Sequence, residues 1–201
     1  MNKKITIIDY GMGNLYSVQN ALKAIGAEPV VTSDAAVIAQ AEKILLPGVG
    51  AFGDCMANLE RSGLIPVIMD SLNSGKPFLG ICLGMQLLFE GSDEAPGVKG
   101  LGFFKGQVKL LRTELKIPHM GWNKLELRNP SPLLEGAEGE YVYFVHSFHA
   151  EPEDTSIITS VCDYGMEVTA SVGRGNVQAF QFHPEKSSSV GMRLLKNFVE
   201  L

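Results

Sequence analysis

The sequence predicts an α/β protein with a doubly wound, mainly parallel sheet in its first half and an antiparallel, strand-rich second half. Up to about residue 91, short apolar runs alternate with amphipathic segments, which is typical of βαβ units. Beyond this point, strand-like runs follow one another with turn signals between them, leaving little room for crossover helices. No linker of different composition divides the halves, so residues 1–201 are expected to form one domain.

Four strands are expected in the first half, each indicated by a short apolar or β-branched run. They cover residues 4–8, 29–31, 43–46 and 77–81. A helix is expected at residues 15–25, where apolar side chains recur at helical spacing, and a short one at 36–41. Pro66 is well placed near the start of a helix over residues 66–72, and residues 82–90 carry helix-forming side chains on nearly all faces. Gly26 and Gly91 end two of these helices, since glycine readily adopts the left-handed conformation of a helix C-cap.

The second half is expected to hold short strands separated by turn signals such as Asn129-Pro130. These strands cover residues 107–111, 123–128, 141–148, 157–162, 168–172 and 177–182. Met192, Leu195 and Val199 recur at helical spacing, so residues 189–201 predict a final helix that packs back on the sheet.

Composition argues against several classes of function. The net charge is −5 and Lys and Arg form no cluster, so neither a nucleic acid nor an anionic membrane is an expected partner. Cys55, Cys82 and Cys162 are an odd number at wide spacings, which fits neither a disulfide framework nor a zinc site. Asp9 interrupts the first apolar run too early for a signal peptide, so a cytoplasmic location is expected.

Residues 80–84 have the spacing of a nucleophile elbow, with Cys82 where hydrolases of the G-x-S-x-G type carry serine. Glycine is expected at positions 80 and 84 because a sharp strand-to-helix turn leaves no room for side chains where the chain folds back. Such a turn lifts the thiol above the sheet at a helix N-terminus, which favours the thiolate. The alternative is a small buried cysteine in an ordinary strand-to-helix turn.

A cysteine nucleophile needs a base and a group that orients the base. Among the four histidines, His183 follows an expected strand, and Pro184 stiffens the backbone beside it. Glu185 is close enough to hold the imidazole, fix its tautomer and stabilise the imidazolium. The alternative is a histidine that ends a strand beside a solvated glutamate.

Two glycine-containing loops follow expected strands, at the edge where open α/β sheets place ligands. The glycines of residues 47–53 let backbone N–H groups turn toward a ligand, although a flexible connection is the simpler interpretation. Gly11 and Gly13 follow the first strand, but Tyr16 stands where a dinucleotide-binding motif has its third glycine, which argues against that function. Asn14 in this loop is a candidate for a functional surface.

The glycine loop, the elbow cysteine and a late His-Pro-Glu together are far more specific than any one of them. Their combination resembles the class I glutamine amidotransferases, whose glutaminase domain has these motifs in the same order. The resemblance implies a flavodoxin-like fold and hydrolysis of L-glutamine to glutamate and ammonia, with no cofactor. Further segments are similar to the branch of this family that serves histidine biosynthesis: residues 94–102, 118–123, 143–147 and 182–187.

The resemblance also implies roles for individual residues. Cys82 attacks the side-chain amide and forms a γ-glutamyl thioester, while His183, held by Glu185, transfers the protons. The implied oxyanion donors are the backbone N–H groups of Leu83 and Val49. The implied substrate-binding residues are Gly48, Gly50, Gln86, Glu94, Ser147 and Phe148. For Gln86 the alternative is an ordinary polar position on a helix.

A partner follows from the same resemblance: a (β/α)₈-barrel cyclase that receives the ammonia and forms a heterodimer with this chain. Asn14, Trp122 and Lys186 match positions associated with that interface. Trp122 has a second interpretation, since a lone tryptophan beside a glycine is often part of a core. His146 and His149 alternate with apolar residues on an expected strand, which favours structural or interface roles over metal ligation.

Two other functions compete with this one. A glutaminase for a chorismate-using synthase would keep the chemistry, but those relatives usually carry a second proline in the loop that begins here at Pro47. A non-catalytic regulatory module of the same fold would bind a barrel partner without chemistry. The intact Cys82, His183 and Glu185 argue against it, and trapping Cys82 with an electrophilic glutamine analogue would distinguish the two.

Overall fold

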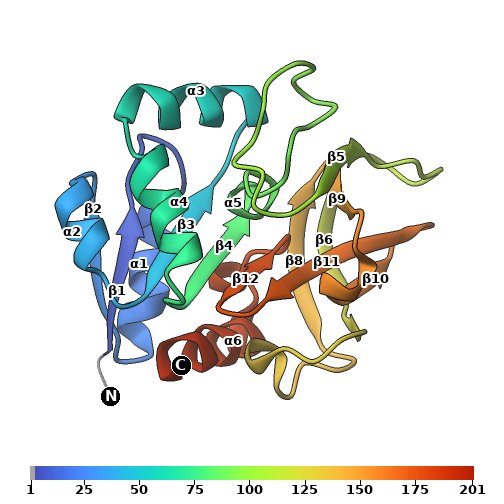
Figure 1. The fold of residues 1–201 in the computed structure, drawn as a ribbon. Helices are drawn as coiled ribbons and strands as arrows, with labels where there is room; N and C mark the ends of the chain where they lie inside the picture. Colours follow the sequence, from blue (N-terminus) through green and yellow to red (C-terminus); the bar gives the residue numbers. More distant parts are fainter. Residues whose placement is uncertain (1–2) are drawn as a thin grey trace.

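A computed structural model describes residues 3–201, and its first half alternates strands with helices (Figure 1). The strands of this half are β1 (Lys4–Ile8), β2 (Glu28–Thr32), β3 (Ile44–Gly48) and β4 (Phe78–Cys82). The helices are α1 (Leu15–Ala24), α2 (Ala35–Gln40), α3 (Phe52–Ser62), α4 (Ile65–Asn73) and the single turn α5 (Leu83–Gln86).

The second half consists mainly of strands and ends in a helix that returns to the first half. The strands are β5 (Gly106–Leu110), β6 (His119–Lys124), β7 (Glu126–Leu127), β8 (Tyr141–His146), β9 (Phe148–Pro152), β10 (Ile158–Asp163), β11 (Glu167–Arg174) and β12 (Val177–Phe180). The final helix is α6 (Ser188–Glu200), which contacts α1 beside the parallel strands.

The central sheet has the strand order β2-β1-β3-β4-β12-β11-β10-β7. From β2 to β12 neighbouring strands are parallel, and from β12 to β7 they are antiparallel. In the described part of the chain β5 pairs with β9, and β6 pairs with β8, in two further sheets. The predicted doubly wound, mixed and mainly parallel architecture is confirmed.

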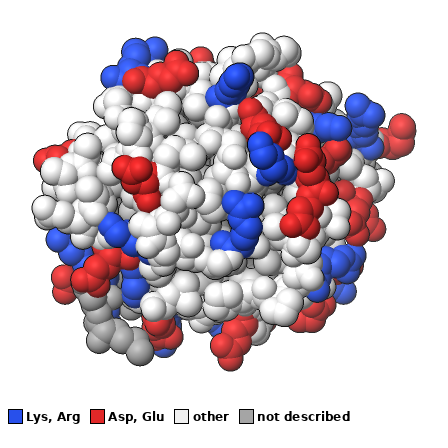
Figure 2. Space-filling view, viewed as in Figure 1, with Lys and Arg blue, Asp and Glu red and all other residues white. Residues whose placement is uncertain are grey.

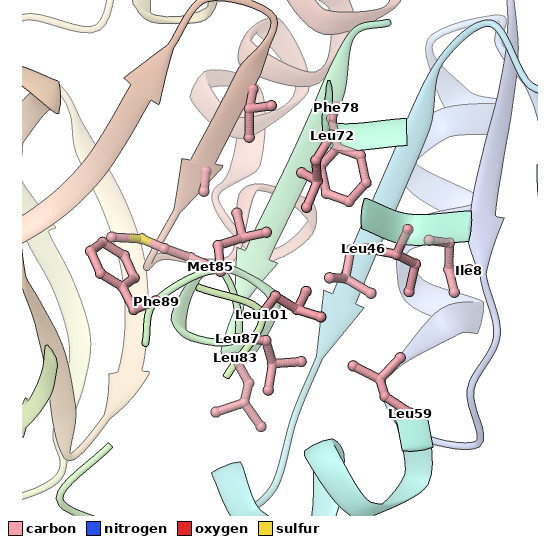
Figure 3. Close-up of a cluster of buried hydrophobic side chains, with 14 of the residues drawn as sticks. Ile8, Leu46, Leu59, Leu72, Phe78, Leu83, Met85, Leu87, Phe89 and Leu101 are labelled. Carbon is pink, nitrogen blue, oxygen red and sulfur yellow. The ribbon is translucent and has the colours of Figure 1, made fainter. Parts of the chain in front are cut away.

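Side chains of the parallel strands enter two cores, one on each face of the sheet. Leu46 and Phe78 join the cluster that includes Leu59 of α3 (Figure 3), whereas Leu45 and Leu79 join the cluster that includes α1 and α6. Consecutive strand residues point to opposite faces, so a continuous apolar run serves both cores. Both faces of these strands are covered, which leaves the strand ends as the accessible edge.

Helix α3 was not predicted from the sequence. A loop was expected at residues 47–53, and the next helix was expected to begin at about residue 66. Phe52, Met56 and Leu59 are buried on one side of this helix, at helical spacing. Gly63 ends it with a φ of 69°, the left-handed C-cap that favours glycine. The prediction was wrong because the glycines around Val49 indicated a loop, although the apolar residues that follow them recur at helical spacing.

The helix expected over residues 82–90 is also wrong in its length, since α5 is a single turn. The carbonyl oxygen of Leu87 accepts from the N–H of Leu101 at 2.8 Å, and that of Leu88 from Phe104 at 2.9 Å. A continued helix would have used these carbonyls for its own hydrogen bonds. The loop that returns over residues 100–104 satisfies them instead.

Two strands of the second half differ from expectation. Residues 141–148 form two strands, because the chain leaves β6 and joins β5 at Ser147. The strand expected over residues 123–128 begins earlier, at His119, and is interrupted before β7. This earlier start places His119 directly opposite His146.

Charged side chains of both signs are mixed around the face shown in Figure 2, and no large area of one sign stands out on it. Across residues 3–201, the helices are all too short or too polar to span a lipid bilayer.

Candidate active site

The carboxyl ends of β3 and β4 border a cavity of about 490 Å³, which β8 and β9 also line. Gly48 pairs with Cys82 across the two parallel strands, so the glycine loop and the elbow meet there. The lining residues are Asn14, Val49, Gly50, Cys82, Leu83, Gln86, Glu94, Pro118, Val145, His146, Ser147, Phe148, His183 and Lys186. Most residues predicted to act in catalysis or binding therefore share one cavity.

The remaining predicted residues lie close by or on the surface. Gly48 is buried at the end of β3, and the Glu185 side chain is buried beside His183. Trp122 is 52% exposed on β6, so its interpretation as a core residue is wrong. A larger cavity of about 830 Å³ runs along residues 90–102 and is lined by none of the predicted catalytic residues.

Cys82 forms the turn between β4 and α5 in a strained conformation. Its φ is 53° and its ψ is −112°, which residues with a side chain rarely adopt. A Cβ atom at Gly80 would lie 2.9 Å from the Gly84 carbonyl oxygen, and one at Gly84 would collide with the carbonyl of Leu46. The turn therefore has no room for side chains at Gly80 and Gly84, as predicted. The surrounding core maintains the strained backbone conformation of Cys82.

His183 and Glu185 form a buried pair beside Cys82. Nδ1 of His183 lies 2.7 Å from Oε1 of Glu185, and the two side chains are 3% and 1% exposed. Burial alone lowers the pKa of His183, but hydrogen bonds with Cys82 and Glu185 outweigh it and raise the pKa to about 10. Because the carboxylate uses Nδ1, Nε2 is the nitrogen available for the proton of Cys82.

The backbone of His183 is fixed from two directions. Its N–H donates to the carbonyl oxygen of Tyr143 on β8 at 2.9 Å. Its carbonyl oxygen accepts from the hydroxyl of Ser187 at 2.6 Å, and that hydroxyl also accepts from the N–H of Tyr143 at 2.9 Å. The antiparallel half of the chain thus places the histidine over the elbow of the parallel half.

Gln86 and Gln181 connect the floor of the cavity to Cys82. Nε2 of Gln86 donates to the carbonyl oxygen of Phe148 and to Oε1 of Gln181, both at 3.0 Å. Nε2 of Gln181 lies 3.8 Å from the sulfur of Cys82. The sequence interpretation assigned no role to Gln181, although its position two residues before His183 in an extended segment was a usable signal.

Glu94 contacts the end of the glycine loop. Its Oε2 accepts from the N–H of Phe52 at 2.7 Å, at the N-terminus of α3. Ala51, the N-cap residue of α3, has no side chain that could accept this hydrogen bond, so the remote carboxylate caps the helix. Glu94 therefore lines the cavity and also fixes the chain that leaves it.

A second buried histidine pair adjoins the cavity. Nδ1 of His146 lies 2.8 Å from the carbonyl oxygen of Phe148, and its Nε2 lies 3.0 Å from Nδ1 of His119. Burial lowers the pKa of His119 to about 4 and that of His146 to about 3, so both are neutral at pH 7. Within residues 3–201, no group of three or more His, Cys, Asp or Glu side chains could hold a metal ion.

A family model described as glutamine amidotransferase class-I matches residues 6–201. The chain belongs to this family. Relatives named imidazole glycerol phosphate synthase subunit HisH occur in Aquifex aeolicus, with 53% identity over 97% of this chain and 95% of the relative, and in Syntrophotalea carbinolica, with 50% identity over 98% and 100%.

Solved structures support the fold of this glutamine amidotransferase independently. PurLQS from Thermotoga maritima matches with a TM-score of 0.78 at 21% identity, covering 100% of this chain and 99% of that one. A putative GMP synthase subunit from Thermoplasma acidophilum matches with a TM-score of 0.72 at 17% identity, over 98% and 92%. At such low identity these likenesses concern the fold alone.

The predicted interface residues of the amidotransferase line the cavity or lie beside its lining. Asn14 and Lys186 line the cavity. The ammonium of Lys186 lies 6.0 Å from the centroid of the Tyr143 ring, which is 6.2 Å from the ring of Trp122. Met120, on the same strand as Trp122, is 61% exposed. The exposed side chains of Trp122 and Met120 therefore lie on a strand that pairs with β8, which lines the cavity.

Proposed function

We propose that residues 1–201 act as one glutaminase domain that hydrolyses L-glutamine to glutamate and ammonia. The observation that carries this proposal is the position of Cys82, on a strained elbow beside the buried His183–Glu185 pair, whose separation is 2.7 Å. The cavity in front of Cys82, of about 490 Å³, is large enough for an amino-acid substrate. Family membership supports the reaction class.

The proposed reaction proceeds through a γ-glutamyl thioester. The sulfur of Cys82 bonds to the amide carbon while its proton passes to Nε2 of His183. The carbon–nitrogen bond then breaks, and the imidazolium gives this proton to the departing ammonia. Water attacks the thioester with His183 as base, and the proton returns to the thiolate as glutamate leaves. Glu185 stabilises the imidazolium in both halves.

The tetrahedral intermediates need hydrogen-bond donors for their oxyanion. We assign this role to the N–H groups of Leu83, directly after the nucleophile, and Val49, in the glycine loop; both residues line the cavity. Losing one such donor typically costs about 3 kcal/mol, or roughly a hundredfold in rate. Gly48, Gly50, Gln86, Glu94, Ser147 and Phe148 are proposed to bind the substrate.

We further propose that the ammonia passes to a (β/α)₈-barrel cyclase, which makes imidazole glycerol phosphate and AICAR in histidine biosynthesis. Relatives at about half identity are named as subunits of imidazole glycerol phosphate synthase. Asn14, Trp122 and Lys186 are proposed to contact this partner in a heterodimer, since they line the cavity or lie beside its lining. Because Cys55, Cys82 and Cys162 are free thiols, the proposed compartment is the cytoplasm.

Glutamate release by the complex of this chain with the cyclase tests the reaction. We expect Cys82→Ala to abolish release while binding of the cyclase persists. Cys162→Ala is the matched control, because this cysteine is also buried but lies on β10, outside the cavity. An electrophilic glutamine analogue should add one equivalent of mass to the wild type and none to Cys82→Ala. Unchanged glutamate release by Cys82→Ala would refute the proposal.

A second measurement tests the coupling to the partner. Glutamate release is expected to be low for the chain alone and to rise when the cyclase and its nucleotide ligand are added. Equal rates with and without the partner would contradict the coupling and leave the glutaminase proposal standing.

A further inference from the structure

Two buried residues outside the proposed catalytic triad bind backbone carbonyls of the glycine loop, residues 47–53. The hydroxyl of Tyr10 donates to the carbonyl oxygen of Pro47 at 2.9 Å. The thiol of Cys55, on α3, donates to the carbonyl oxygen of Val49 at 3.5 Å. The phenol oxygen and the sulfur are themselves 3.6 Å apart. Tyr10 and Cys55 thus form one contact pair beneath the loop, which we call the loop anchor.

Both members of the loop anchor are protonated donors at neutral pH. Tyr10 is 4% exposed and Cys55 is fully buried. Burial raises the pKa of Tyr10 above its usual range and that of Cys55 to about 11. Each side chain can therefore keep its hydrogen bond to a backbone carbonyl throughout the physiological pH range.

The anchored carbonyls bracket the part of the loop that faces the nucleophile. The carbonyls of Pro47 and Val49 belong to the peptide units on either side of the Gly48–Val49 peptide, whose N–H is the proposed oxyanion donor. Fixing these two planar units sets the positions of the Gly48 and Val49 Cα atoms and so places the peptide unit between them. A Cβ atom at Gly48 would lie 2.9 Å from the Tyr10 hydroxyl and 2.7 Å from the N atom of Gly84, so the loop is confined between anchor and elbow.

We propose that Tyr10 and Cys55 are positioning residues for the oxyanion hole. By holding the carbonyls of Pro47 and Val49, they keep the Gly48–Val49 peptide, which carries the proposed oxyanion donor, in place beside Cys82. The inference rests on the proposed glutaminase function and names residues that do not touch the substrate. An oxyanion donor acts in the transition state, so we expect the anchor to affect kcat more than KM.

The experiment compares Tyr10→Phe and Cys55→Ala with the wild type, each in complex with the cyclase. We expect each substitution to lower kcat for glutamate release about threefold to tenfold, with KM within about twofold of the wild type. Cys55→Ser keeps a donor and should restore most of the loss. Tyr164→Phe is the matched control for Tyr10, since its hydroxyl also donates to a backbone carbonyl, that of Lys116 at 2.8 Å. Cys162→Ala is the control for Cys55.

Amide hydrogen exchange supplies a readout that does not depend on glutamine. The N–H groups of residues 48–50 should exchange faster in Tyr10→Phe and Cys55→Ala than in the wild type or the controls. An unchanged or increased kcat in both variants, or an equal loss in the controls, would overturn the inference. A wild type without glutaminase activity would instead refute the proposed function, and equal exchange of the loop amides would then refute the anchor independently.

Discussion

The buried pairs His183–Glu185 and His119–His146 have surroundings that give their histidines opposite acid–base behaviour. His183 has the carboxylate of Glu185 at 2.7 Å and Cys82 beside it, and its pKa rises to about 10. His119 and His146 contact each other at 3.0 Å, and burial lowers their pKa values to about 4 and 3. Burial is common to both pairs, so the neighbouring charge decides which histidine can hold a proton.

The neutral pair has a defined direction of hydrogen bonding. Nδ1 of His146 must donate to the carbonyl oxygen of Phe148, so its Nε2 accepts from Nδ1 of His119. Nε2 of His119 is then an acceptor facing the amide of Asn123 at 3.4 Å. The rings of Phe144 and Tyr164 stack against His119, with centroids at 4.7 and 3.9 Å. The His119–His146 pair is therefore suited to a structural role, whereas the His183–Glu185 pair is suited to carry a proton.

The largest effect should follow from removing the proton carrier. We expect His183→Ala to lower kcat for glutamate release by about 10³-fold or more, because His183 is the proposed acceptor of the Cys82 proton. His149→Phe is the control, since His149 is buried on β9 away from the cavity lining. Steady-state glutamate release by the two variants measures the difference. A kcat of His183→Ala within tenfold of the wild type would contradict the role of His183 as the proton carrier.

Removing only the charge of the carboxylate should have a smaller effect. Glu185→Gln keeps a hydrogen-bond acceptor near Nδ1 but no longer stabilises the imidazolium, so the pKa of His183 should fall. We expect kcat to drop by about tenfold to a hundredfold, because the acid and base steps lose their driving force. NMR titration of His183 in the wild type and in Glu185→Gln measures the shift. An unchanged pKa would show that the carboxylate does not set the behaviour of this histidine.

The two pairs should also affect stability with opposite signs as pH changes. The folded pKa values of His119 and His146 lie below their unfolded value of about 6.5, so the unfolded chain binds more protons and stability falls as pH drops from 6.5 toward 4. His183, with a raised pKa, contributes stability below pH 6.5 that is lost as pH rises toward 10.

His119→Phe tests the acid side of this expectation. The phenyl ring preserves the stack with Phe144 and Tyr164 but does not titrate. Between pH 6 and 4.5, the slope of the unfolding free energy should decrease by up to about 1.4 kcal/mol per pH unit. Urea unfolding at several pH values measures this slope. The same slope in variant and wild type would mean that His119 binds no proton on unfolding.

The smallest effect is expected at the outer end of the neutral pair. Nδ2 of Asn123 donates to the carbonyl oxygen of Asp163 at 2.8 Å and faces His119 at 3.4 Å. Asn123→Ala should lower the unfolding free energy by about 1 kcal/mol and change kcat less than about twofold. Thermal unfolding and glutamate release provide the two measurements. A large loss of kcat with little loss of stability would give the neutral pair a catalytic role.

Local spacing was enough to predict the features that depend on a few neighbouring residues. Gly80 and Gly84 flank Cys82 for a steric reason that is evident from the motif, and the structure shows the same close contacts. Glu185 lies two residues after His183, and the short intervening chain brings the side chains to 2.7 Å. The strand and helix pattern likewise indicated the parallel half, because each element carries its own period.

Features that depend on distant segments could not be predicted in this way. The helix ends after α5 because N–H groups of the loop over residues 100–104 donate to the carbonyl oxygens of Leu87 and Leu88. The sequence of residues 82–90 does not indicate that these donors will be there. Gln181 reaches Cys82 only because β12 pairs with β4. Trp122 lies opposite Tyr143 in the β6–β8 pair and is exposed, and its own neighbours in sequence do not specify that placement.

The sequence by itself determined the strained cysteine turn, the His-Pro-Glu segment and the alternation of strands and helices, because bond geometry and side-chain period act within a few residues. Only the tertiary structure decided which groups face Cys82. The pairing of β3, β4 and β12 brings the glycine loop, the elbow and the histidine segment to one edge of the sheet. Burial and the neighbouring charges then make His183 basic and keep His119 and His146 neutral, since pKa values depend on groups that only folding brings together.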